Sequence, residues 1–214
     1  MKKSVLITLP NFDDVTTYLS IFSKEIILNC QKNQIKIKCL EKEKVTSINT
    51  TNIIKKLDCK MIIFNGHGSP KSIRGHKNEK LISLGENDYL LNNRITYARS
   101  CWALLELGKK CVEGNKGCFI GYKIPFMFII DNTRITNPIK DNIAKIFFDT
   151  SNLVPIGLIK GHTAKESNEN SKRSMLKAIN KALTNNDKDS HAIAQILWNN
   201  YISQGVVGDA NEQL

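Results

Sequence analysis

The sequence lacks any apolar run that approaches the roughly 20 residues needed to cross a bilayer. Its first residues, MKKSVLITLPNFDD, are basic, but their apolar part is only VLITLP and an acidic pair follows, which does not fit a secretory signal. These absences predict a cytoplasmic protein without a membrane partner. The composition, 41% hydrophobic and 24% charged, is typical of a folded globular chain, and 214 residues suit a single domain over 1–214.

Common metal and cofactor motifs are also missing. The cysteines contain no CxxC pair and no paired spacing, so we expect reduced thiols rather than a zinc site or disulfides. His76 and His67 have no third ligand at a convincing spacing. The first strand is not followed by GxGxxG, and GxxxxGK[ST] and GxSxG do not occur, which argues against nucleotide-binding enzymes and serine hydrolases. We therefore expect no metal and no cofactor.

Arginine is scarce in a strongly basic chain. The net charge is +11, yet 26 of the 31 basic residues are lysine, and arginine is the usual bidentate reader of phosphate and guanine. The lysines are also spread along the whole sequence. This pattern favours a general compositional bias over a specific nucleic-acid surface, with weak electrostatic attraction to acidic partners as the alternative.

Apolar strands alternate with amphipathic helices, which predicts an α/β fold with a mainly parallel sheet. Strands are expected at 3–9, 34–40, 59–65, 94–99 and 117–122. The period-two alternation of 34–40 suggests a sheet edge. Helices are expected at 13–30 behind Asp13 as a cap, and at 47–57, 102–111, 139–148, 175–183 and 193–201. Residues 69–93 suggest a surface hairpin and loop, 125–130 a strand or extended segment, and 161–170 a mobile polar loop.

Two apolar runs each end in a reactive side chain. MIIFNGHG brings His67 to the end of one predicted strand, and ITYARSCWA brings Cys101 to the end of a later one. In an open α/β sheet, the carboxyl ends of adjacent parallel strands converge on one crevice, so the two side chains can meet. Either residue alone is more often structural, but the pair at two strand ends favours catalysis.

This pair has the chemistry of a cysteine nucleophile and its base. A thiolate is favoured near a histidine and at a helix N-terminus, and Cys101 directly precedes the helix expected at 102–111. His67 would serve as general base toward the thiol and general acid toward a leaving amine. Gly68 has no side chain, so its N–H and that of Cys101 are candidates for an oxyanion hole.

These segments resemble the caspase-like cysteine peptidases of clan CD, which include caspases, gingipains, separases and bacterial CHAT domains. Downstream, CFIGYKIPFMFIID is similar to the CHAT and gingipain segment in which an Ile-Gly strand leads to a second apolar piece and an Asp. The later KRSMLKAINKAL and GVVGDANEQL fit the same order. The resemblance runs from about Lys60 to the end, and only the His-Gly and Cys motifs are specific.

The resemblance implies a three-layer sandwich around a mainly parallel sheet, with Cys101 as nucleophile, His67 as base and Gly68 in the oxyanion hole. It implies an endopeptidase that cleaves a protein or peptide substrate, with a CHAT or gingipain type as the nearest group. By analogy, such a small protease would cut one partner in a bacterial antiviral defence or cell-death system, under the control of an activating partner protein. The alternative is a catalytically inactive caspase-like interaction module.

The specificity pocket is less well defined by the sequence. The acidic residue that selects a basic P1 side chain moves among the subfamilies, and Asp131 is the candidate for it here. A loop aspartate that caps the following segment is an equal alternative. Tyr122 is the candidate for a second wall, and an apolar pocket of Tyr122, Ile124 and Phe126 would instead suit an uncharged P1.

Overall fold

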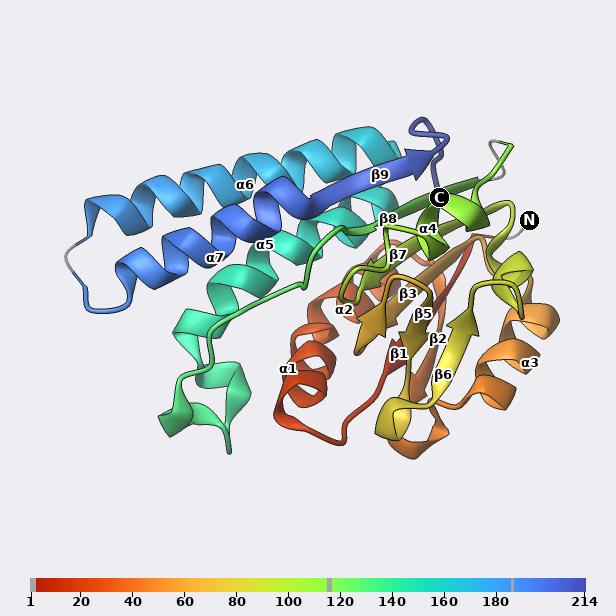
Figure 1. Ribbon diagram of the computed structural model, residues 1–214, viewed down its shortest axis with the longest axis horizontal. Helices are drawn as coiled ribbons and strands as arrows, with labels where there is room; N and C mark the ends of the chain where they lie inside the picture. The colour runs from red at the N-terminus through yellow and green to blue at the C-terminus, as the bar shows by residue number, and fades with distance from the viewer. Residues whose placement is uncertain (1–2, 115–116, 186) are drawn as a thin grey trace.

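The computed structural model describes residues 3–114, 117–185 and 187–214, and a six-stranded sheet forms its centre (Figure 1). The strand order is β2-β1-β3-β7-β8-β9. The strands are β1 (Ser4–Leu9), β2 (Lys36–Glu41), β3 (Met61–Asn65), β7 (Arg94–Arg99), β8 (Gly117–Tyr122) and β9 (Gln204–Gly208). The first five in this order run parallel, and only β9 is antiparallel. The predicted mainly parallel sheet is confirmed, with β2 at its edge.

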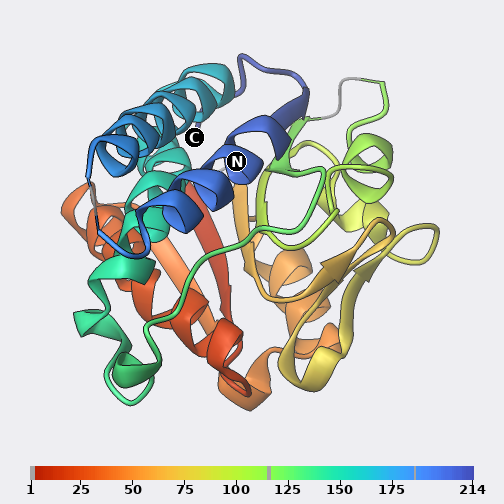
Figure 2. The same cartoon turned by 60° about the vertical axis from the view of Figure 1, so that its left-hand side comes forward.

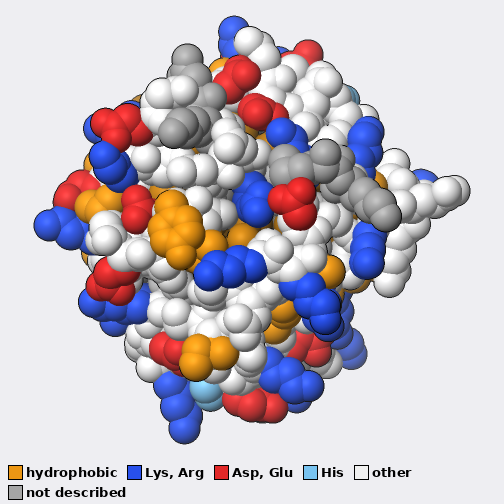
Figure 3. Space-filling view, turned by 90° about the vertical axis from the view of Figure 1, so that its right-hand side faces the viewer, with side chains coloured by type: hydrophobic (Ala, Val, Ile, Leu, Met, Phe, Trp, Pro, Cys, Tyr) orange, Lys and Arg blue, Asp and Glu red, His pale blue; other side chains and the backbone are white. Residues whose placement is uncertain are grey.

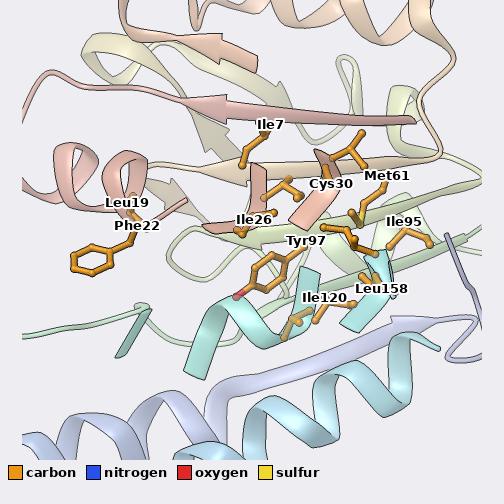
Figure 4. Close-up of a cluster of buried hydrophobic side chains, with 14 of the residues drawn as sticks. Ile7, Leu19, Phe22, Ile26, Cys30, Met61, Ile95, Tyr97, Ile120 and Leu158 are labelled. Carbon is orange, nitrogen blue, oxygen red and sulfur yellow. The ribbon is translucent and has the colours of Figure 1, made fainter. Parts of the chain in front are cut away.

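Helices cover both faces of this sheet. On one face lie α1 (Asp14–Phe22), α2 (Lys24–Lys32) and α5 (Asn142–Ile159), and on the other lie α3 (Ser47–Leu57) and the short α4 (Leu107–Cys111). Alternate strand residues point to opposite faces, so Ile7 joins the first core and Leu6 the second. Figure 4 shows the first core, where Tyr97 and Met61 of the sheet meet Ile26 of α2. The three layers expected from the sequence are therefore present.

Two further helices extend the layer formed by α5. Helices α6 (Ala164–Thr184) and α7 (Ser190–Ser203) pack with α5 around a separate apolar cluster that includes Phe147, Met175 and Leu197. Strand β9 follows α7 directly and returns the chain to the sheet beside β8. None of the described helices combines the length and the apolar character that a membrane-spanning helix requires.

The expected hairpin region is a small antiparallel sheet of β4 (Gly68–Ser69), β5 (Ser72–Arg74) and β6 (Lys80–Ser83). Ile73, Leu81 and Ile82 are fully buried and attach this sheet to the core around α3. Two short 3₁₀ turns accompany the small sheet: His76–Asn78 lies between β5 and β6, and Asp88–Leu91 follows β6. A third, Lys42–Lys44, precedes α3. The small sheet begins at Gly68, so it fixes the backbone next to His67.

Several predicted boundaries were wrong. The helix expected at 13–30 is two helices, α1 and α2, that meet at Ser23. The Ser23 hydroxyl donates to Leu19 O, and bonds of this kind between a serine side chain and the backbone often bend helices. The polar stretch expected as a mobile loop at 161–170 is mostly the start of α6, held by a capping box between Thr163 and Glu166. The helix expected at 139–148 begins at Asn142 and continues to Ile159 through a buried Pro155.

Segment 123–131 is extended but joins no sheet. It crosses beneath α7 as a single strap (green in Figure 2), with Lys123 N–H donating to Ser203 O at 3.0 Å. The Asn200 side chain donates to Met127 O at 2.7 Å and accepts from Met127 N–H at 3.1 Å. Phe126 and Phe128 insert between these contacts into the aromatic core around Phe148. The strap is thus attached by both its backbone and its side chains.

Charged side chains of both signs are mixed on one face of the molecule (Figure 3). On the face shown in Figure 3, Lys and Arg are interspersed with acidic and uncharged side chains. The compositional interpretation of the high lysine content stays a prediction.

Candidate active site

His67 and Cys101 follow the carboxyl ends of two hydrogen-bonded neighbours, β3 and β7. These strands pair in parallel, with Asn65 opposite Arg99 at their last register position. Each candidate residue lies two positions beyond that pair. The sheet therefore delivers both residues to the same edge, as predicted for adjacent parallel strands.

Gly68 packs directly against the backbone at Cys101. A Cβ atom added to Gly68 would lie 2.8 Å from both Cys101 O and Ser100 Cβ, and 3.2 Å from Cys101 N. Such distances leave no room for a side chain without moving the turn, so glycine is required by close approach. The His-Gly and Ser-Cys segments are consequently in contact.

Two backbone N–H groups at this contact have no acceptor on a neighbouring strand within the described residues. Arg74 N–H donates to His67 O at 3.0 Å, and Gly68 is opposite Ile73 in the antiparallel register. This geometry makes Gly68 and Ile73 a non-hydrogen-bonded pair, so the Gly68 N–H points away from β5. Within the described part of the chain, the Cys101 N–H donates to no other residue. Both donors predicted for an oxyanion hole are thus unengaged by neighbouring strands.

The Cys101 thiol is partly covered by the strap. Burial is the larger influence and raises the pKa of the thiol above its usual 9.0, while hydrogen bonding to the backbone of Phe126 and of Cys101 itself acts in the opposite direction. At neutral pH the thiol is therefore protonated in this conformation. Activation of the sulfur would depend on removal of that proton.

The helix expected to begin at Trp102 is absent, which corrects the predicted source of thiolate stabilisation. Residues 101–106 form turns, and the only helix here is α4, five residues that start at Leu107. Trp102 has a φ of +58°, a left-handed conformation that costs a bulky residue energy and cannot begin a right-handed helix. No helix begins within residues 101–106, so no helix dipole starts directly after the sulfur. Cys101 is followed by a strained turn instead of a helix.

Asp13 holds the imidazole of His67 and was not identified as a site residue from the sequence. Its Oδ2 accepts from His67 Nε2 at 2.7 Å, while Oδ1 accepts from Thr16 N–H at 2.8 Å and caps α1. Burial alone would raise the pKa of the carboxyl, but the hydrogen bonds from His67 and Thr16 outweigh it and hold the pKa below the usual 3.8. The carboxylate is therefore ionised and able to orient the ring.

The signal for Asp13 was present in the sequence. Asp13 follows the end of β1, and β1 pairs with β3, which carries His67 beyond its own end. A carboxylate after a third strand end fits the same convergence argument that joined His67 to Cys101. It was interpreted only as a helix cap, a role that it also performs.

Phe12 separates His67 from His76. Its ring meets the His67 ring edge-on at 6.0 Å between centroids and the His76 ring at 5.6 Å. Among the described residues, no group of three His, Cys, Asp or Glu side chains is arranged to hold a metal ion. Phe12 instead forms an apolar wall beside the His67 ring.

A buried arginine ties the two strand ends together. Arg99 is 1% exposed, and its guanidinium donates to Asn65 Oδ1 at 2.9 Å, Asn152 Oδ1 at 2.8 Å and Ser23 Oγ at 2.6 Å. These bonds link β7 to β3, α5 and α2. Arg99 lies two residues before Cys101, so the network fixes the direction in which the chain leaves the sheet.

The two residues predicted for a specificity pocket lie in different surroundings. Tyr122 is fully buried, and its hydroxyl donates to Gln204 Oε1 at 2.9 Å, so it presents no surface to a substrate in this conformation. Asp131 ends the strap, and its Oδ1 accepts from Thr133 N–H at 2.9 Å as the cap of a short 3₁₀ helix, Asn132–Arg134. Hydrogen bonds from Thr133 lower the pKa of Asp131. These contacts fit the alternative in which Asp131 caps the following segment, and its role in P1 selection stays a prediction.

The same arrangement of strands and helices occurs in solved peptidase structures. The complex of Porphyromonas gingivalis RgpB pro- and mature domains matches 98% of this chain and 47% of that one, with a TM-score of 0.57 and 10% identity. The chain shares the fold of the matched part of this structure. The Arg-specific cysteine proteinase gingipain R (RgpB) matches 97% of this chain and 46% of its own, with a TM-score of 0.56 and 13% identity.

The similarity has clear bounds. The chain spans about half the length of these gingipain structures. No protein-family model matches the sequence, and a search of curated proteins gave no match. At 10% and 13% identity, the structural likeness establishes the fold alone and leaves the site residues to be argued from their own geometry.

Proposed function

We propose that the protein is a cysteine endopeptidase in which Cys101 is the nucleophile and His67 the general base. The observation that carries the proposal is the contact of Gly68 with the Cys101 backbone, because it joins the histidine and cysteine segments at one point. The hydrogen bond from His67 Nε2 to Asp13 supports it independently. Three strand ends thereby supply a nucleophile, a base and a group that orients the base.

The reaction proceeds through an acyl-enzyme. His67 takes the Cys101 proton on Nδ1, and the sulfur attacks the peptide carbonyl carbon to form a C–S bond. The N–H groups of Gly68 and Cys101 bind the resulting oxyanion. Collapse breaks the C–N bond, and His67 returns the proton to the leaving amine. Water, deprotonated by His67, then hydrolyses the thioester and regenerates the thiol.

Asp13 gives this base its tautomer and stabilises its charged form. With the Nε2 proton held by the carboxylate, Nδ1 is the nitrogen that exchanges a proton with the thiol. The imidazolium formed after proton transfer is then paired with an ionised carboxylate. This pairing compensates for the burial that raises the pKa of Cys101.

The substrate that we propose is a protein or peptide segment bound beside the strap. The matched structures include a proteinase described as Arg-specific, and Asp131 is the residue here that would favour a basic P1 side chain. The remaining proposals rest on analogy: a CHAT-like or gingipain-like enzyme, formed from one domain, that cuts a partner in bacterial antiviral defence or cell death inside the cytoplasm.

A catalytically inactive interaction module is the second candidate. The raised pKa and partial burial of the Cys101 thiol favour it, since a protonated and covered sulfur is a poor nucleophile. A peptidyl electrophile separates the two functions. Selective labelling of Cys101 over the other cysteines supports the peptidase, and labelling no faster than that of Cys39, the other partly exposed thiol, supports the inactive module.

The deciding experiment measures cleavage of a diverse peptide library by mass spectrometry. We expect the wild-type protein to cut, Cys101→Ala and His67→Ala to lose cleavage, and all three to have the same circular dichroism. Cys39→Ala, which removes another partly exposed thiol, is the matched control and should cut normally. Unchanged cleavage by Cys101→Ala would contradict the proposal.

A further inference from the structure

The helices beyond the sheet leave a groove open to solvent. It lies between the first half of α5, the second half of α6 and the start of α7, and its volume is about 610 Å³. Such a volume falls within the usual range of ligand and peptide sites. The groove contains neither His67 nor Cys101 and so is separate from the candidate active site.

The floor of the groove is apolar, with isoleucines of α5 on one side and small side chains of α6 on the other. Ile143 and Ile146 of α5 are only partly buried and lie against the cluster that contains Ile193 of α7. On α6, Ala178 and Ala182 stand one turn apart and face the same groove. Ala182 is buried within the apolar cluster, and Ala178 is partly exposed above it. These two short side chains leave space on this wall of the groove.

The α6 wall carries two free cations above this floor. Lys177 and Lys181 are exposed, one helical turn apart, and within the described ranges neither lies within ion-pair distance of a carboxylate. On the opposite wall, Asp149 is already bound by Lys145 at 2.6 Å. Other acidic residues occur only where the groove ends, at Asp187 and Asp189. The α6 wall is consequently the positively charged side of the groove.

We propose that this groove binds an amphipathic α-helix of a partner protein. Its apolar side chains would cover Ile143, Ile146 and the two alanines, in the helix-in-groove mode. Acidic residues one turn apart on that helix would pair with Lys177 and Lys181, which have the same spacing. A second copy of this chain fits less well, because each copy carries a net charge of +11. The inference goes beyond the proposed peptidase function and does not depend on it.

The test is direct binding of a designed helix, measured by fluorescence anisotropy with the full chain. The probe is a fluorescein-labelled peptide with leucines at i, i+3, i+4 and i+7 and glutamates one turn apart. Two companion peptides carry lysine in place of glutamate, or the same composition in scrambled order. We expect saturable binding of the glutamate peptide only.

Charge reversal at the two groove lysines should reverse the preference between the glutamate peptide and the lysine peptide. We expect Lys177→Glu with Lys181→Glu to weaken binding of the glutamate peptide about tenfold and to strengthen binding of the lysine peptide. Lys55→Glu with Lys56→Glu on α3 makes the same change in net charge on exposed lysines outside the groove and should leave both affinities within about twofold. Ala182→Trp, which fills the groove, should abolish binding, with folding checked by circular dichroism.

Three results would overturn the proposal. The first is no binding of the glutamate peptide to the wild-type chain, and the second is equal binding of the scrambled peptide. The third is sedimentation as a dimer that Ala182→Trp converts to a monomer, which would assign the groove to a second copy. Cleavage activity does not enter any of these readouts.

Discussion

Asp13 performs two tasks with its two carboxylate oxygens, one toward the helix and one toward the imidazole. Asparagine keeps a cap for α1 but removes the negative charge. We therefore expect Asp13→Asn to fold normally and to lower kcat/KM by about 100-fold at neutral pH, since residues that orient a catalytic ring typically contribute this much. Asp14→Asn, an exposed neighbour in the same helical turn, should cleave at the wild-type rate.

The pH dependence of stability follows from the same carboxyl group. Its folded-state pKa lies below the usual 3.8, so the ionised form stabilises the fold above that value, and this stability is lost as pH falls through the folded-state pKa. Urea midpoints should consequently fall more for the wild-type protein than for Asp13→Asn between pH 5 and pH 3. Parallel declines would contradict a stabilising role of the ionised carboxylate.

Arg99 is the residue whose loss should cost the most stability. Arg99→Met leaves Asn65 Oδ1 and Asn152 Oδ1 buried without their donor, and we expect the free energy of unfolding in urea to fall by about 3 kcal/mol. Arg173→Met, on the exposed surface of α6, should change it by less than about 0.5 kcal/mol. Equal stability of the two variants would mean that the network does not hold the strand ends.

At the scale of elements, strands were easier to predict than helix boundaries. The strands 59–65 and 94–99 are apolar because the sheet is covered on both faces, and this single cause makes them visible in the sequence. The helix expected at 102–111 failed because periodicity does not reveal that Trp102 adopts a left-handed conformation. The start of α6 was hidden by its polar composition, although Thr163 and Glu166 form a capping box that the sequence does contain.

The candidate site was predictable where it depends on strand order and unpredictable where it depends on tertiary contacts. His67, Gly68 and Cys101 come from motifs at strand ends, whereas the surroundings of Tyr122 depend on Gln204, 82 residues later. A tyrosine at the end of a strand has the same local pattern whether it lines a pocket or fills the core. Only packing distinguishes the two.

One side chain of α7, Asn200, holds the middle of the strap. Asn200→Ala removes both hydrogen bonds to Met127 and leaves its backbone unpaired next to the core. We expect amide exchange in 123–131 to accelerate about tenfold or more, and the free energy of unfolding to fall by about 2 kcal/mol. Hydrogen exchange with mass spectrometry measures the first quantity, and Asn199→Ala serves as the neighbouring control. Unchanged exchange would show that Phe126 and Phe128 suffice to hold the strap.

At the scale of the whole molecule, Asp141 joins three segments distant in sequence. It accepts from Tyr18 of α1, from Asp131 N–H at the end of the strap and from Ala144 N–H in the first turn of α5. Asp141→Ala should reduce protection from hydrogen exchange in all three segments together, and lower the free energy of unfolding by about 3 kcal/mol. Loss of protection at α5 alone would show that Asp141 acts only as the N-terminal cap of α5.

The contact between Gly68 and the Cys101 backbone also restricts which residues evolution can place at position 68. No side chain fits at position 68 while the turn at Cys101 keeps its place. In any relative that retains this turn, we expect glycine to persist after histidine even as strap residues such as Met127 diverge with the substrate. Ancestry in this group would then be recorded at a position that cannot carry a side chain.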